Sequence, residues 1–517
     1  MAGADGGVTG ANAATTGSRR LSLDRVLLPP GRLASAVMLA VLALGVVVIL
    51  SWLVTAVAHV DDGYAVDHVS GSWMALAAYA GSGTLYPPLY DGDVFGGTRF
   101  MPVPILLLAG AASVLQDDLV SAKILSYLLA GALVVLTFVL LRRRCPLPVA
   151  LLLASTILVT GTGLTAATSV RNDVLPVILQ LGAVALVARS QTRANTVASG
   201  LLSALAVVSK LSAVWAPLAI GIWLLSNRDR RRLAEFVTVF LAGAGLALGA
   251  FQAASGGRMT ENVLGLSVAT AGRLGSLPDE VARLRLIGRE GLGPLAVLIV
   301  LAILGTLLAA KRRQLTPYHL AFACASLVTA IVLVDPGAFV NHLIDVQVLS
   351  VIVVGELWRR TASPSGGLSL VSAATLAVLV ACTAATYRQN VDLGRDLDVL
   401  VHGTASEDRV PRLAGSVSAD DSILSEDPFV SVSRGERPIV LDPFMLLSIA
   451  ERHPEWRSDL VRRIENADFD KIVLLYQPHS APLWYRRLHF GEVVVRAIER
   501  TYRPVARVEG YWIYEPK

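Results

Sequence analysis

The stretch LASAVMLAVLALGVVVILSWLVTAVAHV, residues Leu33–Val60, contains no acidic residue, lysine or arginine. A helix needs roughly 20 consecutive apolar residues to cross the hydrocarbon core of a bilayer. The stretch exceeds that length, and it starts too far from Met1 and runs too long for the apolar part of a signal peptide. It therefore predicts a retained membrane-spanning helix, which decides the class of fold.

The composition extends this prediction to most of the chain. Of the 517 residues, 54% are hydrophobic and only 16% are charged, whereas a soluble protein carries about a quarter charged residues. The net charge of +5 agrees with Lys and Arg in cytoplasmic loops, so it does not indicate a nucleic-acid partner. We expect a polytopic α-helical membrane protein with about 11 transmembrane helices.

The expected spans follow the apolar runs of the sequence. They are 33–60, 120–141, 146–164, 173–188, two short spans within 196–225, 234–254, 291–310, 317–334, 339–357 and 367–386. Residues 101–115 are apolar but short, so we expect an interfacial or re-entrant helix there. Residues 255–290 are expected to form a long outer loop.

Lys and Arg set the expected orientation in the cytoplasmic membrane, because cytoplasmic loops carry an excess of both. Arg19, Arg20, Arg25 and Arg32 precede the first span, which predicts a cytoplasmic N-terminus. If residues 101–115 do not span the membrane, the compact basic clusters that follow the later spans fall on the cytoplasmic side, like the N-terminus. The C-terminal domain is then expected outside.

The chain divides into three predicted parts: a disordered cytoplasmic tail (1–32), a transmembrane domain (33–388) with an outer loop (61–119), and a soluble extracytoplasmic α/β domain (389–517). In the last part, apolar runs predict short strands at 422–425, 438–441 and 471–476, and the periodicity predicts a helix over 458–467. Residues 505–514 alternate like a hairpin that turns at Gly510.

The first outer loop opens with Asp61, Asp62, Gly63 and Tyr64 directly after the first span. A carboxylate at a membrane boundary can act as a general base, because burial raises its pKa. The same pattern is also typical of a solvated helix end. Asp67 and His68 follow a few residues later.

Further candidates are polar residues at the edges of apolar segments. Arg171-Asn172-Asp173 begins a span, where an arginine either anchors the helix or binds a phosphate. Lys210 lies alone between two apolar stretches and either binds an anionic group or extends to the interface. Asn341-His342 begins a late span, and Arg99 lies in a Gly- and Pro-rich stretch before the interfacial helix.

Taken in order, these motifs resemble the GT-C fold glycosyltransferases that use polyprenyl-phosphate sugars, a superfamily that includes protein O-mannosyltransferases and lipid A aminoarabinose transferases. In that family an acidic pair, a small residue and an aromatic residue follow the first span, as Asp61 to Tyr64 do here. The positions of Arg171, Asp173, Lys210, Asn341 and His342 also match, although this acidic pair is Asp-Asp where the family commonly has Asp-Glu.

The resemblance implies an inverting transfer of sugar to an acceptor hydroxyl on the outer face of the membrane. Asp61 or Asp62 is the implied base, and Arg171, Lys210 and, more weakly, Arg99 are implied to bind the donor phosphate. Tyr64, Asp173, Asn341 and His342 are implied to bind substrate. The implied partners are a polyprenyl-phosphate sugar, a glycan, lipid or protein acceptor, and membrane lipid, and the resemblance leaves a divalent metal, Mg or Mn, open.

Other functions remain open at this stage. A transporter or flippase would need charged residues within spans and internal symmetry, of which the sequence contains little. A ligase or polymerase of surface polysaccharide is expected to have basic catalytic loops, and the acidic first loop argues against it. An inactive scaffold for cell-envelope assembly would keep the same fold.

Overall fold

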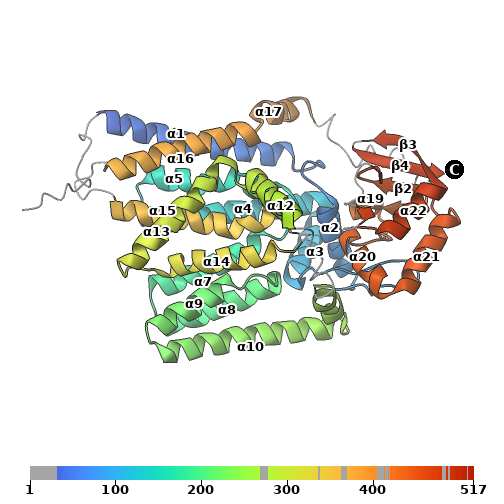
Figure 1. Ribbon diagram of the computed structural model, residues 1–517, viewed down its shortest axis with the longest axis horizontal. Helices are drawn as coiled ribbons and strands as arrows, with labels where there is room; N and C mark the ends of the chain where they lie inside the picture. Colours follow the sequence, from blue (N-terminus) through green and yellow to red (C-terminus); the bar gives the residue numbers. More distant parts are fainter. Residues whose placement is uncertain are drawn as a thin grey trace, which may run out of the picture.

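The structure, a computed structural model, describes residues 32–267, 277–335, 338–361, 369–403, 413, 417, 418, 420–479, 485, 486, 489–508 and 510–517. Within them the chain forms a helical bundle with a smaller sheet-containing domain at one end (Figure 1). The predicted disordered tail lies outside the described residues, except for Arg32, where α1 begins.

The helices of the bundle follow the apolar segments of the sequence. They are α1 (Arg32–Ala58), α3 (Pro102–Leu115), α4 (Asp118–Arg142), α5 (Leu147–Ser155), η2 (Thr156–Leu158), α6 (Gly161–Thr168), α7 (Val174–Arg189), α8 (Arg193–Ser209), α9 (Trp215–Ser226), α10 (Arg230–Ala254), η4 (Gly293–Ala296), α13 (Val297–Lys311), α14 (Pro317–Val332), η5 (Val340–Leu343), α15 (Ile344–Thr361) and α16 (Leu370–Asn390). By length and apolar composition, six described helices can cross a membrane, or seven if the bent pair built from α5, η2 and α6 is one span. The apolar helices α3, α7, α9 and α14 are shorter.

The predicted span 146–164 is bent by 71° between η2 and α6. Thr160 begins the new helix, because its hydroxyl accepts a hydrogen bond from the Gly163 backbone N–H at 2.9 Å. A side chain at Gly163 would overlap the carbonyl of Ile157, so glycine permits the close turn. The bent pair leads into the segment that carries Arg171.

The predicted outer loop 255–290 is not wholly irregular. It contains the π-helix η3 (Thr260–Gly265) and the helix α12 (Leu277–Gly291). Arg283 anchors α12, because its guanidinium donates hydrogen bonds to the carbonyls of Leu333, Asp335 and Ala338. The helix is stabilised by contacts distant in sequence, which the local pattern does not reveal.

The C-terminal domain contains a four-stranded sheet in the order β1-β2-β4-β3, with β1 parallel to β2 and the other pairs antiparallel. Its elements are β1 (Ile423–Ser425), α19 (Pro428–Val432), α20 (Pro443–Arg452), α21 (Pro454–Glu465), β2 (Lys471–Leu474), α22 (Glu492–Thr501), β3 (Tyr502–Val508) and β4 (Tyr511–Pro516). As the alternation predicts, β3 and β4 form a hairpin, and Gly510 adopts a positive φ of 92° at its turn.

The predicted strand 438–441 is not part of this sheet. Val440 instead forms an isolated parallel bridge with Phe95 of the first outer loop. The Phe95 backbone N–H donates to the Ile439 carbonyl at 2.7 Å, and its carbonyl accepts from the Leu441 N–H at 2.9 Å. The apolar run is therefore buried against the bundle's outer loop, and this pairing joins the two domains.

Two helices make further contacts between the domains. The helix α2 (His68–Gly81) packs against α19, and a side chain at Gly71 would clash with Asp427 and the Phe429 backbone. The amphipathic helix α17 (Leu393–His402) follows α16 and lies against the end of α1 (Figure 1). The first outer loop is therefore enclosed between the bundle and the C-terminal domain.

Candidate active site

An open apolar groove lies between α2, α3, α4 and the start of α7. Its walls include Leu107 and Leu108 of α3 and Leu125 and Leu129 of α4. Arg171 is the charged residue among the described residues that line it. The groove therefore combines an apolar wall with a single cationic group, an arrangement suited to an anionic amphiphile.

The guanidinium of Arg171 has only part of its hydrogen-bonding capacity satisfied. One terminal nitrogen, Nη2, donates to the carboxylate of Asp67. Its Nε is buried and has no hydrogen-bond partner among the described residues. Because buried N–H groups are almost always paired in folded proteins, this donor is a candidate for ligand binding.

Asp67 is held in place as the N-cap of α2. Its Oδ1 accepts hydrogen bonds from the backbone N–H of Ser70 at 3.0 Å and from the Ser70 hydroxyl at 3.1 Å. Burial disfavours the charged carboxylate, but the charge of Arg171 more than compensates and lowers the pKa of Asp67 to about 2. Asp67 is therefore a carboxylate at neutral pH.

A second ion pair lies on the neighbouring helix ends. Lys210, the C-cap of α8, donates to Asp173 Oδ1 at 2.7 Å, and the Asn341 amide lies 3.0 Å from both oxygens of the same carboxylate. His342 follows Asn341, and the charges of Lys210 and Asp173 act on its imidazole. Asp67, Arg171, Asp173, Lys210 and Asn341 are called the groove cluster below.

Arg99 occupies the boundary with the C-terminal domain. It donates to Asp335 at 2.7 Å, and its guanidinium lies over the ring of Phe444, 5.1 Å from the centroid. Its charge also acts on His342. Arg99 is thus a neighbour of the groove cluster and is engaged by both domains.

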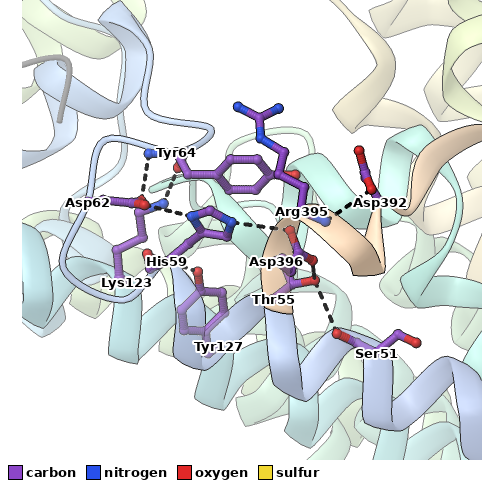
Figure 2. Close-up of polar contacts among 10 residues, drawn as sticks. All are labelled: Ser51, Thr55, His59, Asp62, Tyr64, Lys123, Tyr127, Asp392, Arg395 and Asp396. Atoms are coloured by element: carbon purple, nitrogen blue, oxygen red, sulfur yellow. Dashed lines mark hydrogen bonds and ion pairs between the residues drawn. The ribbon is translucent and has the colours of Figure 1, made fainter. Parts of the chain in front are cut away.

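The acidic motif of the first loop lies in a separate arrangement (Figure 2). Asp62 Oδ2 is 2.6 Å from His59 Nδ1, and Asp62 Oδ1 accepts from the Tyr64 backbone N–H at 2.9 Å. The other ring nitrogen of His59 lies 3.3 Å from Asp396 of α17, which also accepts from the Thr55 hydroxyl. His59, Asp62 and Asp396 are called the aspartate–histidine cluster.

Neighbouring side chains enclose this cluster (Figure 2). The ring of Tyr64 stacks on His59 with 4.1 Å between centroids, and the Tyr127 hydroxyl lies 3.5 Å from the His59 carbonyl. The ammonium of Lys123, which is fully buried, donates to the Tyr64 carbonyl and, at 3.0 Å, to the carbonyl of Thr168. Because Thr168 lies three residues before Arg171, Lys123 connects the two clusters through the backbone.

The structure separates the two members of the acidic pair. Asp62 is buried, whereas Asp61 is exposed and has no hydrogen bond or ion pair among the described residues. Of the other sequence candidates, it brings together Arg171, Asp173, Lys210 and Asn341, with His342 adjacent. Asp61, Asp62 and Tyr64 lie outside that group.

Sequence reasoning missed several residues that organise these clusters. His59 lies within the apolar run 33–60, and no local pattern relates it to Asp396. Lys123 carried a usable signal, since a lone lysine in an apolar span is costly unless it is paired. Asp67 follows the acidic pair closely in the sequence, and no local pattern indicates its contact with Arg171.

A third group of titratable residues lies where α2 contacts the C-terminal domain. The rings of His68 and His489 are 5.0 Å apart, and His489 lies 2.8 Å from Glu426. Burial, followed by the charge of His489, lowers the pKa of His68 to about 4. Burial raises the pKa of the neighbouring Asp427 to about 6.

The described residues contain no group of three or more His, Cys, Asp or Glu side chains arranged to hold a metal ion. Mg and Mn prefer several oxygen ligands at short distances. In the groove cluster, each of the two carboxylates is engaged by a cationic side chain. A bound Mg or Mn therefore stays a prediction, which the described residues neither support nor contradict.

The helical bundle and the C-terminal domain at one end of it define a class of fold. It is a polytopic α-helical membrane protein of the GT-C type with a small C-terminal α/β domain, which confirms the fold expected from the sequence. The sequence itself matches no protein-family model, and it matches no curated protein.

Several solved structures share the fold of this chain at low sequence identity. ArnT from Cupriavidus metallidurans bound to undecaprenyl phosphate has a TM-score of 0.57 and 14% identity, covering 91% of this chain and 97% of ArnT. ArnT in the apo state gives 0.55 and 14%, covering 93% and 98%. The Archaeoglobus fulgidus oligosaccharyltransferase in the apo form gives 0.53 and 12%, covering 90% of this chain and 73% of that one.

Proposed function

We propose that this protein is a membrane glycosyltransferase that transfers a sugar from a polyprenyl-phosphate donor to an acceptor hydroxyl. The observation that carries the proposal is the apolar groove headed by Arg171, whose buried Nε has no partner among the described residues. A polyprenyl chain matches the apolar wall, and a phosphate matches the guanidinium. The fold shared with ArnT, whose structure contains undecaprenyl phosphate, supports this choice of donor.

In this mechanism Arg171 and Lys210 stabilise the leaving phosphate. The bond between the anomeric carbon and the phosphate oxygen breaks while the acceptor oxygen bonds to the same carbon from the opposite face. Cations fixed beside the developing negative charge lower the barrier, because they need no reorganisation during the reaction. Asp173 holds Lys210 in position, and the Asn341 amide in turn donates to Asp173.

The acceptor proton must pass to a base as the new bond forms. We assign this role to the acidic pair, with Asp61 as the accessible carboxylate and Asp62 as its anchor. Asp61 is exposed in the first outer loop, while Asp62 fixes that loop through contacts with His59 and the Tyr64 backbone. Tyr64, Arg99 and His342 are proposed to contact the sugar or acceptor.

We also propose that the protein lies in the cytoplasmic membrane with its N-terminus inside and its C-terminal domain outside. The basic residues at the C-terminal ends of α4, α13 and α15 support this orientation, because α13 and α15 end on the side of the bundle opposite the C-terminal domain (Figure 1). Two contacts join them there: Arg144 lies 2.6 Å from Glu356, and Arg360 donates to the Gln314 carbonyl at 2.6 Å. On this topology the groove cluster faces the side where flipped lipid-linked sugars are available.

The test is sugar transfer by purified, detergent-solubilised protein. It is offered a panel of radiolabelled polyprenyl-phosphate sugars, with a cell-envelope extract that supplies glycan, lipid and protein acceptors. We expect label to move from one lipid to an acceptor and to remain on the lipid when Asp61 and Asp62 are both replaced by alanine. Folded protein that binds none of the lipids and transfers no label would favour a transporter or a scaffold instead.

A further inference from the structure

Asp67 contacts the guanidinium that we assign to the donor phosphate, and this raises the question of what the carboxylate does there. The pair is not sealed in the interior, since 36% of the Asp67 side chain is exposed against 13% for Arg171. A carboxylate and a phosphate are both oxyanions that bind a guanidinium through the same N–H donors. The two groups therefore compete for Arg171 or repel each other beside it.

Asp67 is poorly placed to be the catalytic base, although it is ionised. An inverting displacement requires the acceptor hydroxyl to approach the anomeric carbon from the face opposite the leaving phosphate. A carboxylate bonded to the phosphate-binding guanidinium lies on the leaving-group side. The geometry points instead to a role in phosphate binding and release.

We propose that Asp67 is the resting counter-ion of Arg171, which occupies the guanidinium in the empty groove and weakens its hold on a lipid-linked phosphate. This inference rests on the proposed function, because it takes the phosphate of a polyprenyl lipid as the competing ligand. Asp67 thus becomes an affinity-setting residue rather than a catalytic one.

Two physical consequences follow from this arrangement. In the empty protein, Asp67 is the carboxylate in contact with a largely desolvated cation, and such a cation is costly to bury without a bonded counter-charge. After transfer, the polyprenyl-phosphate product carries more negative charge than the donor and binds Arg171 more strongly. The nearby carboxylate opposes that attraction and promotes product release.

The test measures binding of undecaprenyl phosphate to the full-length protein in detergent, for the wild type and for Asp67→Asn. Asparagine is also a favoured N-cap, so it preserves the hydrogen bond to Ser70 and the start of α2 while removing the charge. We expect binding about fivefold tighter or more in Asp67→Asn, since removing a competing charge at contact distance has a large effect in a partly buried site. Equal or weaker binding by a variant with an unchanged melting temperature would overturn the proposal.

Two further variants separate charge from shape. Asp67→Glu keeps the negative charge, so we expect it to bind undecaprenyl phosphate within about twofold of the wild type. If Asp67→Glu binds undecaprenyl phosphate as tightly as Asp67→Asn does, the shape of the loop and not the charge sets the affinity, and the proposal is overturned. Arg171→Gln is expected to weaken binding by about tenfold or more, because it removes the cation that binds the phosphate.

Inorganic phosphate distinguishes a lipid headgroup from a free anion. We expect it to bind far more weakly than undecaprenyl phosphate, because the groove wall contributes only to the lipid. If both ligands bind equally and both tighten in Asp67→Asn, Arg171 is a free-phosphate site and the lipid part of the proposal fails. If the wild type and Arg171→Gln bind undecaprenyl phosphate equally, the proposed function fails. If Arg171→Gln weakens binding but Asp67→Asn leaves it unchanged, the proposed function stands and only the inference about Asp67 fails.

Discussion

The groove cluster and the aspartate–histidine cluster lie close together in the structure, yet their side chains are satisfied to very different degrees. His59 and Asp62 are inaccessible to solvent, and each contacts groups from other parts of the chain. In the groove cluster, Arg171 keeps an unpaired buried donor, and Asp67 remains partly exposed.

The difference indicates a division of labour. A buried polar network whose members all have partners rigidifies its surroundings, while an incompletely satisfied one retains capacity for a ligand. We therefore interpret the aspartate–histidine cluster as the support that positions the first outer loop and α17. The groove cluster is interpreted as the part that binds the donor.

The largest effect is expected at the head of the groove. Arg171→Gln should lower sugar transfer by about 10²–10³-fold, because it removes a preorganised charge beside the leaving phosphate. Steady-state transfer from the donor identified in the panel measures this change. Arg193→Gln is the matched control, since Arg193 begins α8 at the other end of the bundle with a side chain that is 80% exposed. A similar loss in the control would contradict the assignment.

The next effect separates the two members of the acidic pair. Asp61→Asn should lower transfer by about 10²-fold or more while leaving undecaprenyl phosphate binding and the melting temperature unchanged, because it removes only an accessible base. Asp62→Asn should lower both transfer and the melting temperature, because Asp62 is bonded within the buried network. Full activity in Asp61→Asn would assign the base elsewhere.

A smaller effect should appear in stability alone. Asp396→Ala should lower the free energy of unfolding by about 2–3 kcal/mol, because it removes the buried carboxylate that contacts His59 Nε2 and the Thr55 hydroxyl. Thermal unfolding in detergent measures it, with Asp398→Ala on the same helix as control, since the Asp398 side chain is 72% exposed. Equal melting temperatures for the two variants would show that α17 does not depend on the cluster.

The smallest effect concerns pH at the domain junction. The pKa of His68 is about 4 in the folded protein, below its ordinary value of 6.5, so folding favours the neutral imidazole. Its contribution is complete above about pH 6.5 and is lost as the pH falls toward 4. His489, Asp67, Glu426 and Arg171 act on its charge, and burial is the main cause.

His68→Gln should therefore reduce the loss of stability between about pH 6.5 and 4 by on the order of 1–2 kcal/mol. Melting temperatures measured across this range test the change. His479→Gln is the control, because the His479 side chain is 76% exposed. If the melting temperature of His68→Gln depends on pH as the wild type's does, His68 is not the source of that dependence.

Much of the architecture was predictable because apolar length and periodicity are local properties. The run Leu33–Val60 appears as α1, residues 120–141 appear within α4, and the alternation around Gly510 appears as a hairpin. Motif order along the chain was enough to predict the GT-C fold, which the structure confirms. The roles of Asp61, Arg171 and Lys210 remain predictions.

Tertiary structure alone decided which charges meet. Asp62 reaches Asp396 through His59 across more than 300 positions of sequence, and Arg171 pairs with Asp67 rather than with the acidic pair. The run 438–441 likewise found its partner in Phe95 rather than in the sheet. Hydrophobic periodicity reports which face of an element is buried, whereas an ion pair depends on where two distant segments come together. The sequence by itself therefore determined which segments form apolar helices and the class of fold, whereas the tertiary structure determined which residues form the site.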